Sequence, residues 1–272
     1  MTGAAQLTRA RRRARQTAKG VVLLAVVVTI ALCIAGLRWW VGRQRPTLNT
    51  ATLCPERGPR GLTVVLIDRT ESLSALQAEA LRHQLERVKD NLPPLHAIEV
   101  YSLVPMSGSL LKASGARVCS PPRPESGLTA NPTRAQQLWD TRFSQPLQAV
   151  FEALLQPHDE PSSPILESIQ SVSVTAFDAV GKDIPRRLIV ASDMLQNTAE
   201  FSQYQDRRTF VDLRSTAYYS RVRSSLPGVQ VQILYVRRHQ HATVQGATHV
   251  AFWEEYFSDC GATLDSVISL PG

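Results

Sequence analysis

The hydrophobic pattern separates one long apolar run near the N-terminus from a series of shorter runs after it. From Gly20 to Leu37 the chain carries no charged residue and no proline. Extended through Val41, the run is about 22 residues long, close to the ~20 that a helix needs to cross a membrane. We therefore predict a transmembrane helix over residues 20–41.

The residues that flank this run indicate its orientation. Six Lys or Arg residues and no Asp or Glu precede it in residues 1–19. The positive-inside rule places such a basic tail in the cytoplasm, and Trp39 and Trp40 follow where an interfacial aromatic belt belongs. We therefore expect a single-pass membrane protein whose C-terminal domain is periplasmic or extracellular.

Two other interpretations of the apolar run are weaker. A cleaved signal peptide has a shorter apolar core and small residues at its cleavage site, whereas this core is long and Arg-Trp-Trp follows it. A lipoprotein anchor would use Cys33, but the bulky Leu32 precedes that cysteine and the apolar run continues beyond it. We favour an uncleaved signal-anchor, with Cys33 as an ordinary apolar residue of the helix.

After the anchor, short apolar runs alternate with helical patterns. Leu62–Ile67 is continuously apolar and rich in β-branched residues, as in a central strand covered on both faces. We predict strands over 62–67, 98–104, 109–118, 187–191, 229–236 and 263–270, and helices over 73–89, 133–155 (broken near Pro146), 163–179 (with Pro164 in its first position), 199–224 and 246–259. This alternation predicts an α/β fold with a doubly wound, mostly parallel sheet and helices on both faces.

Charge and composition place the domain boundaries and exclude one class of partner. The polar, proline-containing segment 42–60 is predicted to be a linker, followed by one domain over 61–272. The net charge of +7 is uneven, because residues 1–45 hold nine of the 30 basic residues and none of the 23 acidic ones. The remainder has 21 basic and 23 acidic residues, a net charge of −2. Nucleic-acid binding therefore loses its electrostatic support.

Oxygen-bearing side chains gather in three loops of the predicted sheet. Asp68, Thr70 and Ser72 follow the first strand, Ser163 precedes a helix, and Asp193 follows a buried strand. In doubly wound sheets, ligands bind beyond the carboxyl ends of the strands, where the strand order reverses. Two carboxylates and three hydroxyls form a hard-oxygen set that suits Mg²⁺ or Mn²⁺ rather than zinc.

The motifs LIDRTES, SSPILESI and LIVASDMLQN, which contain these residues, resemble the metal-ion-dependent adhesion site of von Willebrand factor A-type domains. The resemblance covers roughly residues 61–270 in element order. It implies that Thr70 and Ser72 bind Mg²⁺ (or Mn²⁺ or Ca²⁺) directly and Ser163 directly or through water. Asp68 and Asp193 would act largely through water, and an acidic residue of a protein partner would complete the shell.

The sequence departs from the family pattern at three positions. Thr70 and Ser163 replace the commoner Ser and Thr, and both keep the hydroxyl. Met194 follows Asp193 where the family usually has Gly, so the resemblance does not predict the shape of that loop. The alternative is an A-type fold without metal, in which Asp and Ser only cap the helices that follow.

These observations predict a binding module and not an enzyme. We expect a membrane-anchored A-type domain that uses a divalent cation to bind a protein partner outside the cytoplasm, for example within an envelope assembly. The alternative is a structural scaffold whose metal site is vestigial. A metal-assisted phosphatase or hydrolase is the weakest candidate, because the sequence shows no evident general base or nucleophile beside the metal set and no G-x-S-x-G motif.

Three cysteines beyond the anchor allow three disulfide pairings in an oxidising compartment. Cys54 lies just before the first strand, and an antiparallel third strand would bring Cys119 to the same end of the sheet. Cys260 ends a helix that descends to this end near the opposite edge. We therefore predict a Cys54–Cys119 disulfide with Cys260 free.

Overall fold

The computed structural model describes residues 23–40, 47–103, 111, 113–115, 117–122, 131–156, 158–204 and 208–271. The chain divides into two compact units, Met1–Thr47 and Leu48–Gly272. Among the described residues, Leu23–Trp40 is the one helix long and apolar enough to cross a membrane, with a mean hydropathy of 2.1. The predicted basic tail 1–19, and the ends of the predicted span at 20–22 and 41, lie outside the described residues.

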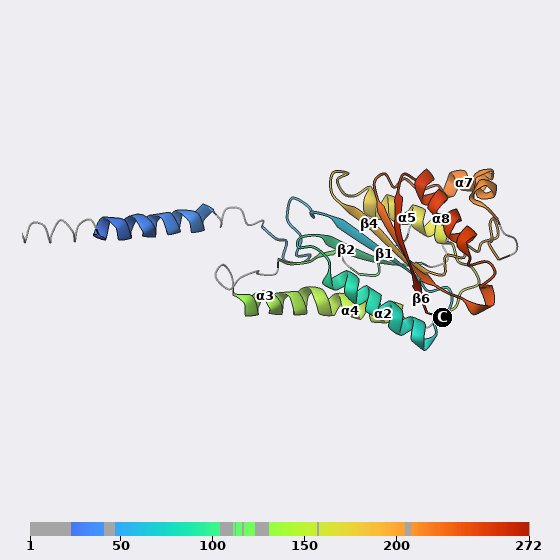
Figure 1. Cartoon of the computed structure of the whole chain (residues 1–272), viewed down its shortest axis with the longest axis horizontal. Coiled ribbons are helices and arrows are strands. Elements are labelled where there is room, and N and C mark those ends of the chain that lie inside the picture. The colour runs from blue at the N-terminus through green and yellow to red at the C-terminus, as the bar shows by residue number, and fades with distance from the viewer. Residues whose placement is uncertain are drawn as a thin grey trace, which may run out of the picture. The chain divides into compact units, whose positions relative to one another are not determined.

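The second unit is built on a six-stranded sheet with the order β3-β2-β1-β4-β5-β6 (Figure 1). Its strands are β1 (Leu62–Asp68), β2 (Ala97–Leu103), β3 (Val118–Cys119), β4 (Arg186–Ser192), β5 (Gln230–Val236) and β6 (Thr263–Leu270). All neighbouring pairs are parallel except β2 and β3. The predicted doubly wound α/β class is therefore confirmed, and the strand order reverses between β1 and β4.

Helices cover both faces of this sheet and enclose a hydrophobic core on each side (Figure 1). One face carries α2 (Ala75–Asp90), α3 (Pro132–Trp139) and α4 (Gln145–Leu154), and the other carries α5 (Ile165–Val172), α6 (Phe210–Arg214), α7 (Ala217–Val222) and α8 (Ala247–Asp259). Strand β1 sends Val64 and Leu66 into one core and Val65 and Ile67 into the other. Two covered faces explain why its sequence is continuously apolar.

Two predicted helices differ from the structure in detail. The helix over 133–155 is not broken at Pro146, because the π-helical segment Asp140–Ser144 joins α3 to α4. Pro146 lies in the first turn of α4, directly after this π-helical segment. The helix over 163–179 begins at Ile165, with Pro164 as its N-cap, and ends in a π-helical turn.

The predicted helix over 199–224 is wrong. Its described residues contain only the short helices α6 and α7, which start at the N-cap residues Thr209 and Thr216. Upstream, Asn197 forms isolated antiparallel bridges with both Ser163 and Ser202. Ser and Thr side chains offer the backbone alternatives to helical hydrogen bonds, which shortens helices. The bridges place this segment beside Ser163.

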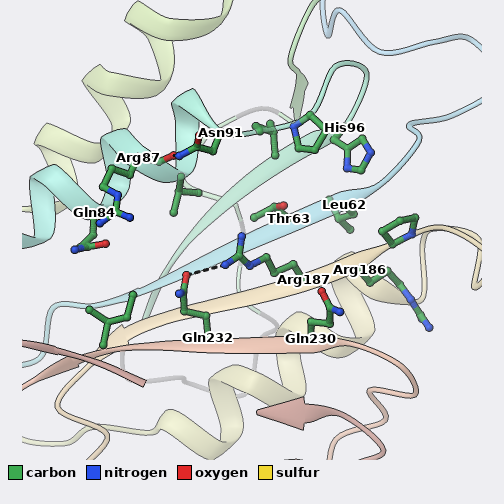
Figure 2. A pocket seen from close by; sticks show the side chains of 15 residues that line it. Leu62, Thr63, Gln84, Arg87, Asn91, His96, Arg186, Arg187, Gln230 and Gln232 are labelled. Carbon is green, nitrogen blue, oxygen red and sulfur yellow. Dashed lines mark hydrogen bonds between the residues drawn. The ribbon is translucent and has the colours of Figure 1, made fainter. Parts of the chain in front are cut away.

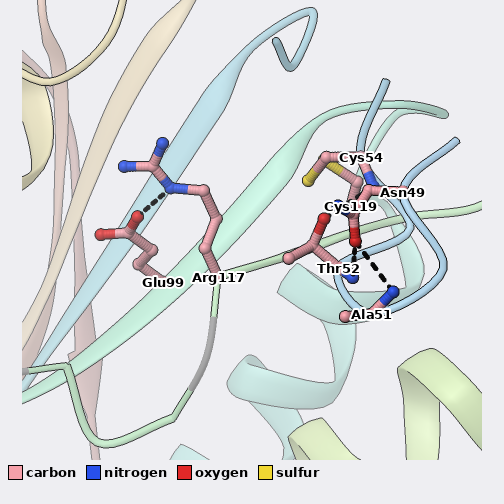
Figure 3. The surroundings of a disulfide bond; sticks show 7 residues. All are labelled: Asn49, Ala51, Thr52, Cys54, Glu99, Arg117 and Cys119. Carbon is pink, nitrogen blue, oxygen red and sulfur yellow. Dashed lines mark hydrogen bonds and ion pairs between the residues drawn. A yellow bond between two sulfur atoms is a disulfide. The ribbon is translucent and has the colours of Figure 1, made fainter. Parts of the chain in front are cut away.

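The latter part of the predicted linker 42–60 belongs to the folded unit (Figure 3). Its turn is stabilised by the Asn49 side chain, whose Oδ1 accepts hydrogen bonds from two backbone amides at 2.8 and 3.1 Å. A disulfide joins Cys54 to Cys119, the pairing expected from the strand order, with a Cα–Cα distance of 4.8 Å. Cys260 is free and buried. The segment is thereby fastened to the sheet before β1 begins.

Replacing both Cys54 and Cys119 by alanine should lower the free energy of unfolding by about 2–4 kcal/mol, because the bond links positions 65 residues apart in the sequence. Urea unfolding of the full chain in detergent micelles measures the change. Reductant should bring the native chain to the stability of the double variant and leave the variant unaffected. Equal stability of the oxidised native chain and the variant would contradict this role.

Candidate functional site

The carboxyl ends of β1 and β4 bring several predicted site residues together. These strands are parallel neighbours, and the chain leaves them in opposite directions along the sheet. Asp68 is the last residue of β1, and Asp193 directly follows β4. Ser163 reaches the same place because its backbone pairs with that of Asn197, in the loop after β4. The predicted position at the switch point of the sheet is therefore where these side chains lie.

The Asp68 carboxylate is the acceptor that three hydroxyl groups share. Thr70 Oγ1 donates to its Oδ1 at 2.7 Å, and the Thr70 backbone N–H donates to the same oxygen at 2.9 Å. Ser192 Oγ and Ser163 Oγ donate to its Oδ2 at 2.6 and 3.3 Å. All three hydroxyl residues are at most 5% exposed. We call Asp68, Thr70, Ser163, Ser192 and Asp193 the carboxyl-end cluster.

Ser192 was not among the predicted residues, although it is the last residue of β4. Its hydroxyl also accepts a hydrogen bond from the Met194 backbone N–H at 2.8 Å. Ser192 therefore couples the loop after β4 to the carboxylate of β1. Its position just before Asp193, at the end of a buried strand, was a signal that could have identified it.

Ser72 points to a different carboxylate from the one shared by the cluster. Its backbone N–H and its Oγ donate to Asp159 Oδ1 at 2.8 and 2.9 Å. These hydrogen bonds favour the ionised form and lower the pKa of the Asp159 carboxyl below its ordinary value. Asp159 lies 87 residues away in an irregular segment, and no sequence pattern predicts this pairing.

Asp193 is the buried carboxylate of the cluster. Its Oδ1 accepts from the Leu195 backbone N–H at 2.9 Å, and the residue is 3% exposed. Burial raises the pKa of the Asp193 carboxyl to about 7, and the nearby Asp68 charge adds to the shift. An ionised Asp193 therefore requires a cation close to it.

Arg238 supplies that cation. Its Nε lies 3.1 Å from Asp193 Oδ2 and 3.2 Å from Glu71 Oε2. Its Nη1 donates to the Ser72 carbonyl at 2.7 Å, and its side chain is 12% exposed. Arg238 was not among the predicted site residues, although it follows β5 at the same end of the sheet as the predicted loops.

The buried amide of Gln245 fixes the backbone around Arg238. Its Oε1 accepts from the Arg238 backbone N–H at 2.6 Å. Its Nε2 donates to the carbonyls of Asp193 and Val236 at 3.0 and 2.9 Å. Gln245 therefore links the end of β5 to the loop after β4 and holds the backbone of Arg238 in a defined position.

Met194 has the left-handed backbone conformation, with φ of 62°. Glycine adopts this conformation freely, whereas for other residues it costs about 1–2 kcal/mol. The Met194 carbonyl accepts hydrogen bonds from Trp253 Nε1 at 2.9 Å and from His249 Nε2 at 3.1 Å, and its side chain is buried. These contacts with α8 hold the loop in a shape that glycine would adopt more easily.

Part of the cluster is suited to a small divalent cation. Thr70 and Ser163 donate their hydroxyl protons to Asp68, which leaves oxygen lone pairs for a cation. Ser72 and Asp193 are engaged by Asp159 and Arg238 instead. No group of three His, Cys, Asp or Glu residues is placed to hold a metal ion in the described part of the chain. A cation here would therefore depend on the hydroxyl ligands.

A separate cavity of about 300 Å³ lies at the opposite, amino end of the sheet, between α2 and the strands (Figure 2). Basic and amide side chains contribute to its lining, among them Arg87, Arg187 and Gln232. Arg187 Nη2 donates to Gln232 Oε1 at 3.0 Å, so this guanidinium already has a partner. None of the predicted site residues lines the cavity.

No protein-family model and no curated protein matches the sequence. Similar solved structures include an aerotolerance-related membrane protein from Bacteroides fragilis, at 11% identity over 78% of this chain and 92% of that chain, with a TM-score of 0.34. A von Willebrand factor type A structure from Catenulispora acidiphila has 11% identity over 75% and 42%, with a TM-score of 0.37. Proximal thread matrix protein 1 from the mussel byssus, with a zinc-occupied MIDAS motif, has 10% identity over 78% and 42%, with a TM-score of 0.41. These are distant likenesses, and the chemistry of the site rests on the residues described above.

Replacing Asp193 by asparagine should remove the pH-dependent contribution of this carboxyl to the free energy of unfolding. Between the ordinary carboxyl pKa of 3.8 and about 7, folded Asp193 keeps a proton that the unfolded chain has released. The folded state is therefore favoured at the acid end of this window and loses stability as the pH rises through it. The free energy of unfolding of the native chain, relative to Asp193→Asn, should fall from pH 4.5 to pH 7 in urea titrations. Parallel pH profiles would contradict this assignment.

Proposed function

We propose that the chain is a membrane-anchored binding module in which the carboxyl-end cluster holds a divalent cation that a carboxylate of a protein partner completes. The observation that carries the proposal is the shared acceptor Asp68. It orients hydroxyls from the loop after β1, from the segment before α5 and from the end of β4 toward one point. Three separate segments converge, which is more than the capping of one helix requires.

The residues divide into those that would contact the cation and those that would support it. Thr70 and Ser163 would bind it directly, and Ser72 would join them after its hydroxyl leaves Asp159. Asp68 and Asp193 would act through water and balance the charge. Hard oxygen ligands favour Mg²⁺, with Mn²⁺ or Ca²⁺ as alternatives. A bound cation would supply positive charge and a coordination position for an acidic side chain of the partner.

The hydrogen bonding around the cluster supports binding rather than turnover. Within the described residues, no histidine or lysine forms a hydrogen bond with the hydroxyls of Thr70, Ser163 or Ser192. Those three hydroxyls donate to Asp68, whose carboxylate also accepts from the Thr70 backbone N–H. A nucleophile needs a base that is free to take its proton.

The same proposal includes a location. The apolar helix Leu23–Trp40 and the basic residues before it support a single membrane span with the N-terminus in the cytoplasm. The Cys54–Cys119 disulfide is compatible with an oxidising compartment for the second unit. The partner would accordingly be a protein in the periplasm or outside the cell, and the net charge of the folded region gives no support for nucleic acid.

Replacing Thr70 by valine keeps the side-chain shape and removes one direct ligand. Isothermal titration of Mg²⁺ and of Mn²⁺ into the full chain in detergent should show one site, weakened at least about tenfold in Thr70→Val. Thr63→Val is the matched control, because Thr63 is 6% exposed and lies at the amino end of the same strand. The control should bind like the native chain. The proposal would be contradicted if the native chain bound neither ion at about 10 mM, a concentration at which even a weak site would be occupied.

Partner capture from solubilised membranes should follow the same pattern. A partner retained in Mg²⁺ should be released by EDTA, lost in Thr70→Val and retained in Thr63→Val. Capture that EDTA does not diminish would favour the scaffold function, in which the domain assembles through its faces without a cation.

A further inference from the structure

Four carboxylates lie in or beside the carboxyl-end cluster. Asp68 and Asp193 belong to the cluster, Glu71 lies in the loop after β1, and Asp159 accepts from Ser72. Among the described residues, Arg238 is the cationic side chain that forms ion pairs with Asp193 and Glu71. The Arg238 guanidinium therefore neutralises the same carboxylate charge that would attract a divalent cation.

The contacts of Arg238 overlap with those needed for a metal ion. Its guanidinium binds the buried carboxylate of Asp193 together with the backbone carbonyls of Glu71 and Ser72, at 2.7 Å for Ser72 and 3.3 Å for Glu71. It thereby bridges the loop after β1 and the loop after β4. The planar fork of an arginine side chain suits such a multiple contact better than an ammonium group would.

The side chain of Arg238 can leave without moving the sheet. Gln245 holds the Arg238 backbone N–H and the Asp193 carbonyl, and neither contact involves the guanidinium. Glu71 also keeps a partner if Arg238 leaves, because Tyr204 Oη donates to Glu71 Oε1 at 2.7 Å. Asp193 would then depend on another cation.

We propose that Arg238 is a built-in counter-cation that closes the cluster, and that a divalent cation binds only by displacing its guanidinium from Asp193. The inference rests on the cation site of the proposed function. Both cations are drawn to the same buried carboxylate and repel each other. The competition is reciprocal, so a change that weakens the contact between Arg238 and Asp193 strengthens metal binding by the same factor.

The test compares Mg²⁺ and Mn²⁺ binding to the native full chain, to Arg238→Gln and to Arg237→Gln in detergent. Arg237 is the matched control, because it is the adjacent arginine and its Nη1 donates to the Gln245 carbonyl instead of a carboxylate. Arg238→Gln should bind at least about tenfold more tightly than the native chain, and Arg237→Gln should match the native chain. An equal gain in metal affinity in both variants would show that the loss of one positive charge explains the gain, and would overturn the proposal.

The remaining outcomes separate this inference from the proposed function. Equal binding by the native chain and Arg238→Gln would overturn the counter-cation and leave the cation site standing. Binding by Arg238→Gln alone would support the counter-cation and contradict metal-dependent function of the native chain. Binding by neither would contradict both.

A second variant and a second measurement cover the case in which Arg238→Gln folds poorly. Arg238→Lys keeps the charge but loses the fork, so its metal affinity should lie between those of the native chain and Arg238→Gln. Mg²⁺ should also raise the midpoint of thermal unfolding more in either variant than in the native chain, because each variant is expected to bind the ion more tightly. A smaller rise in both variants would overturn the proposal.

Discussion

Two carboxylates lie at the ends of neighbouring central strands, Asp68 half-buried and Asp193 buried, and both need compensating partners. Asp68 ends β1 and Asp193 follows β4, and the charge of Asp68 adds to the cost of ionising the buried Asp193. Burying a charge without a partner is expensive, so a fold that places two carboxylates here needs compensating groups. Hydroxyl donors surround Asp68, and Arg238 faces Asp193.

Much of the surrounding structure provides these compensating groups. The bridge between Ser163 and Asn197 brings a hydroxyl to Asp68 from a segment 95 residues away in the sequence. The amide of Gln245 positions the backbone of Arg238. The left-handed Met194 is held by hydrogen bonds from α8 to its carbonyl. The hydroxyl contacts with Asp68 do not involve the Arg238 guanidinium.

The parts of the fold that the sequence predicted are those where a local pattern and burial agree. Leu62–Ile67 is apolar on both faces because it lies between two cores, and this pattern also placed Asp68 at its carboxyl end. The pairing of Cys54 with Cys119 followed from strand order, since an antiparallel β3 ends where β1 begins. The described part of the chain agrees with these expectations because each depends on topology rather than on loop conformation.

The parts that were missed depend on contacts between irregular segments. The start of the helix predicted over 199–224 instead pairs through Ser202 with Asn197, a backbone bridge that helical periodicity cannot reveal. Asp159 meets Ser72 from a loop without a sequence signature. Arg238 follows β5 as one of two consecutive arginines. Its contact with Asp193 distinguishes it from Arg237, and that contact is visible only in the structure.

In the proposed mode of binding, one position at the carboxyl ends of β1 and β4 takes either the Arg238 guanidinium or a divalent cation. Anomalous diffraction from crystals of the full chain grown with Mn²⁺ distinguishes these two occupants. We expect one manganese peak beside the hydroxyls of Thr70 and Ser163, with the Arg238 side chain turned away from Asp193. A peak at that position with Arg238 still paired to Asp193, or manganese bound elsewhere and none in the cluster, would contradict it.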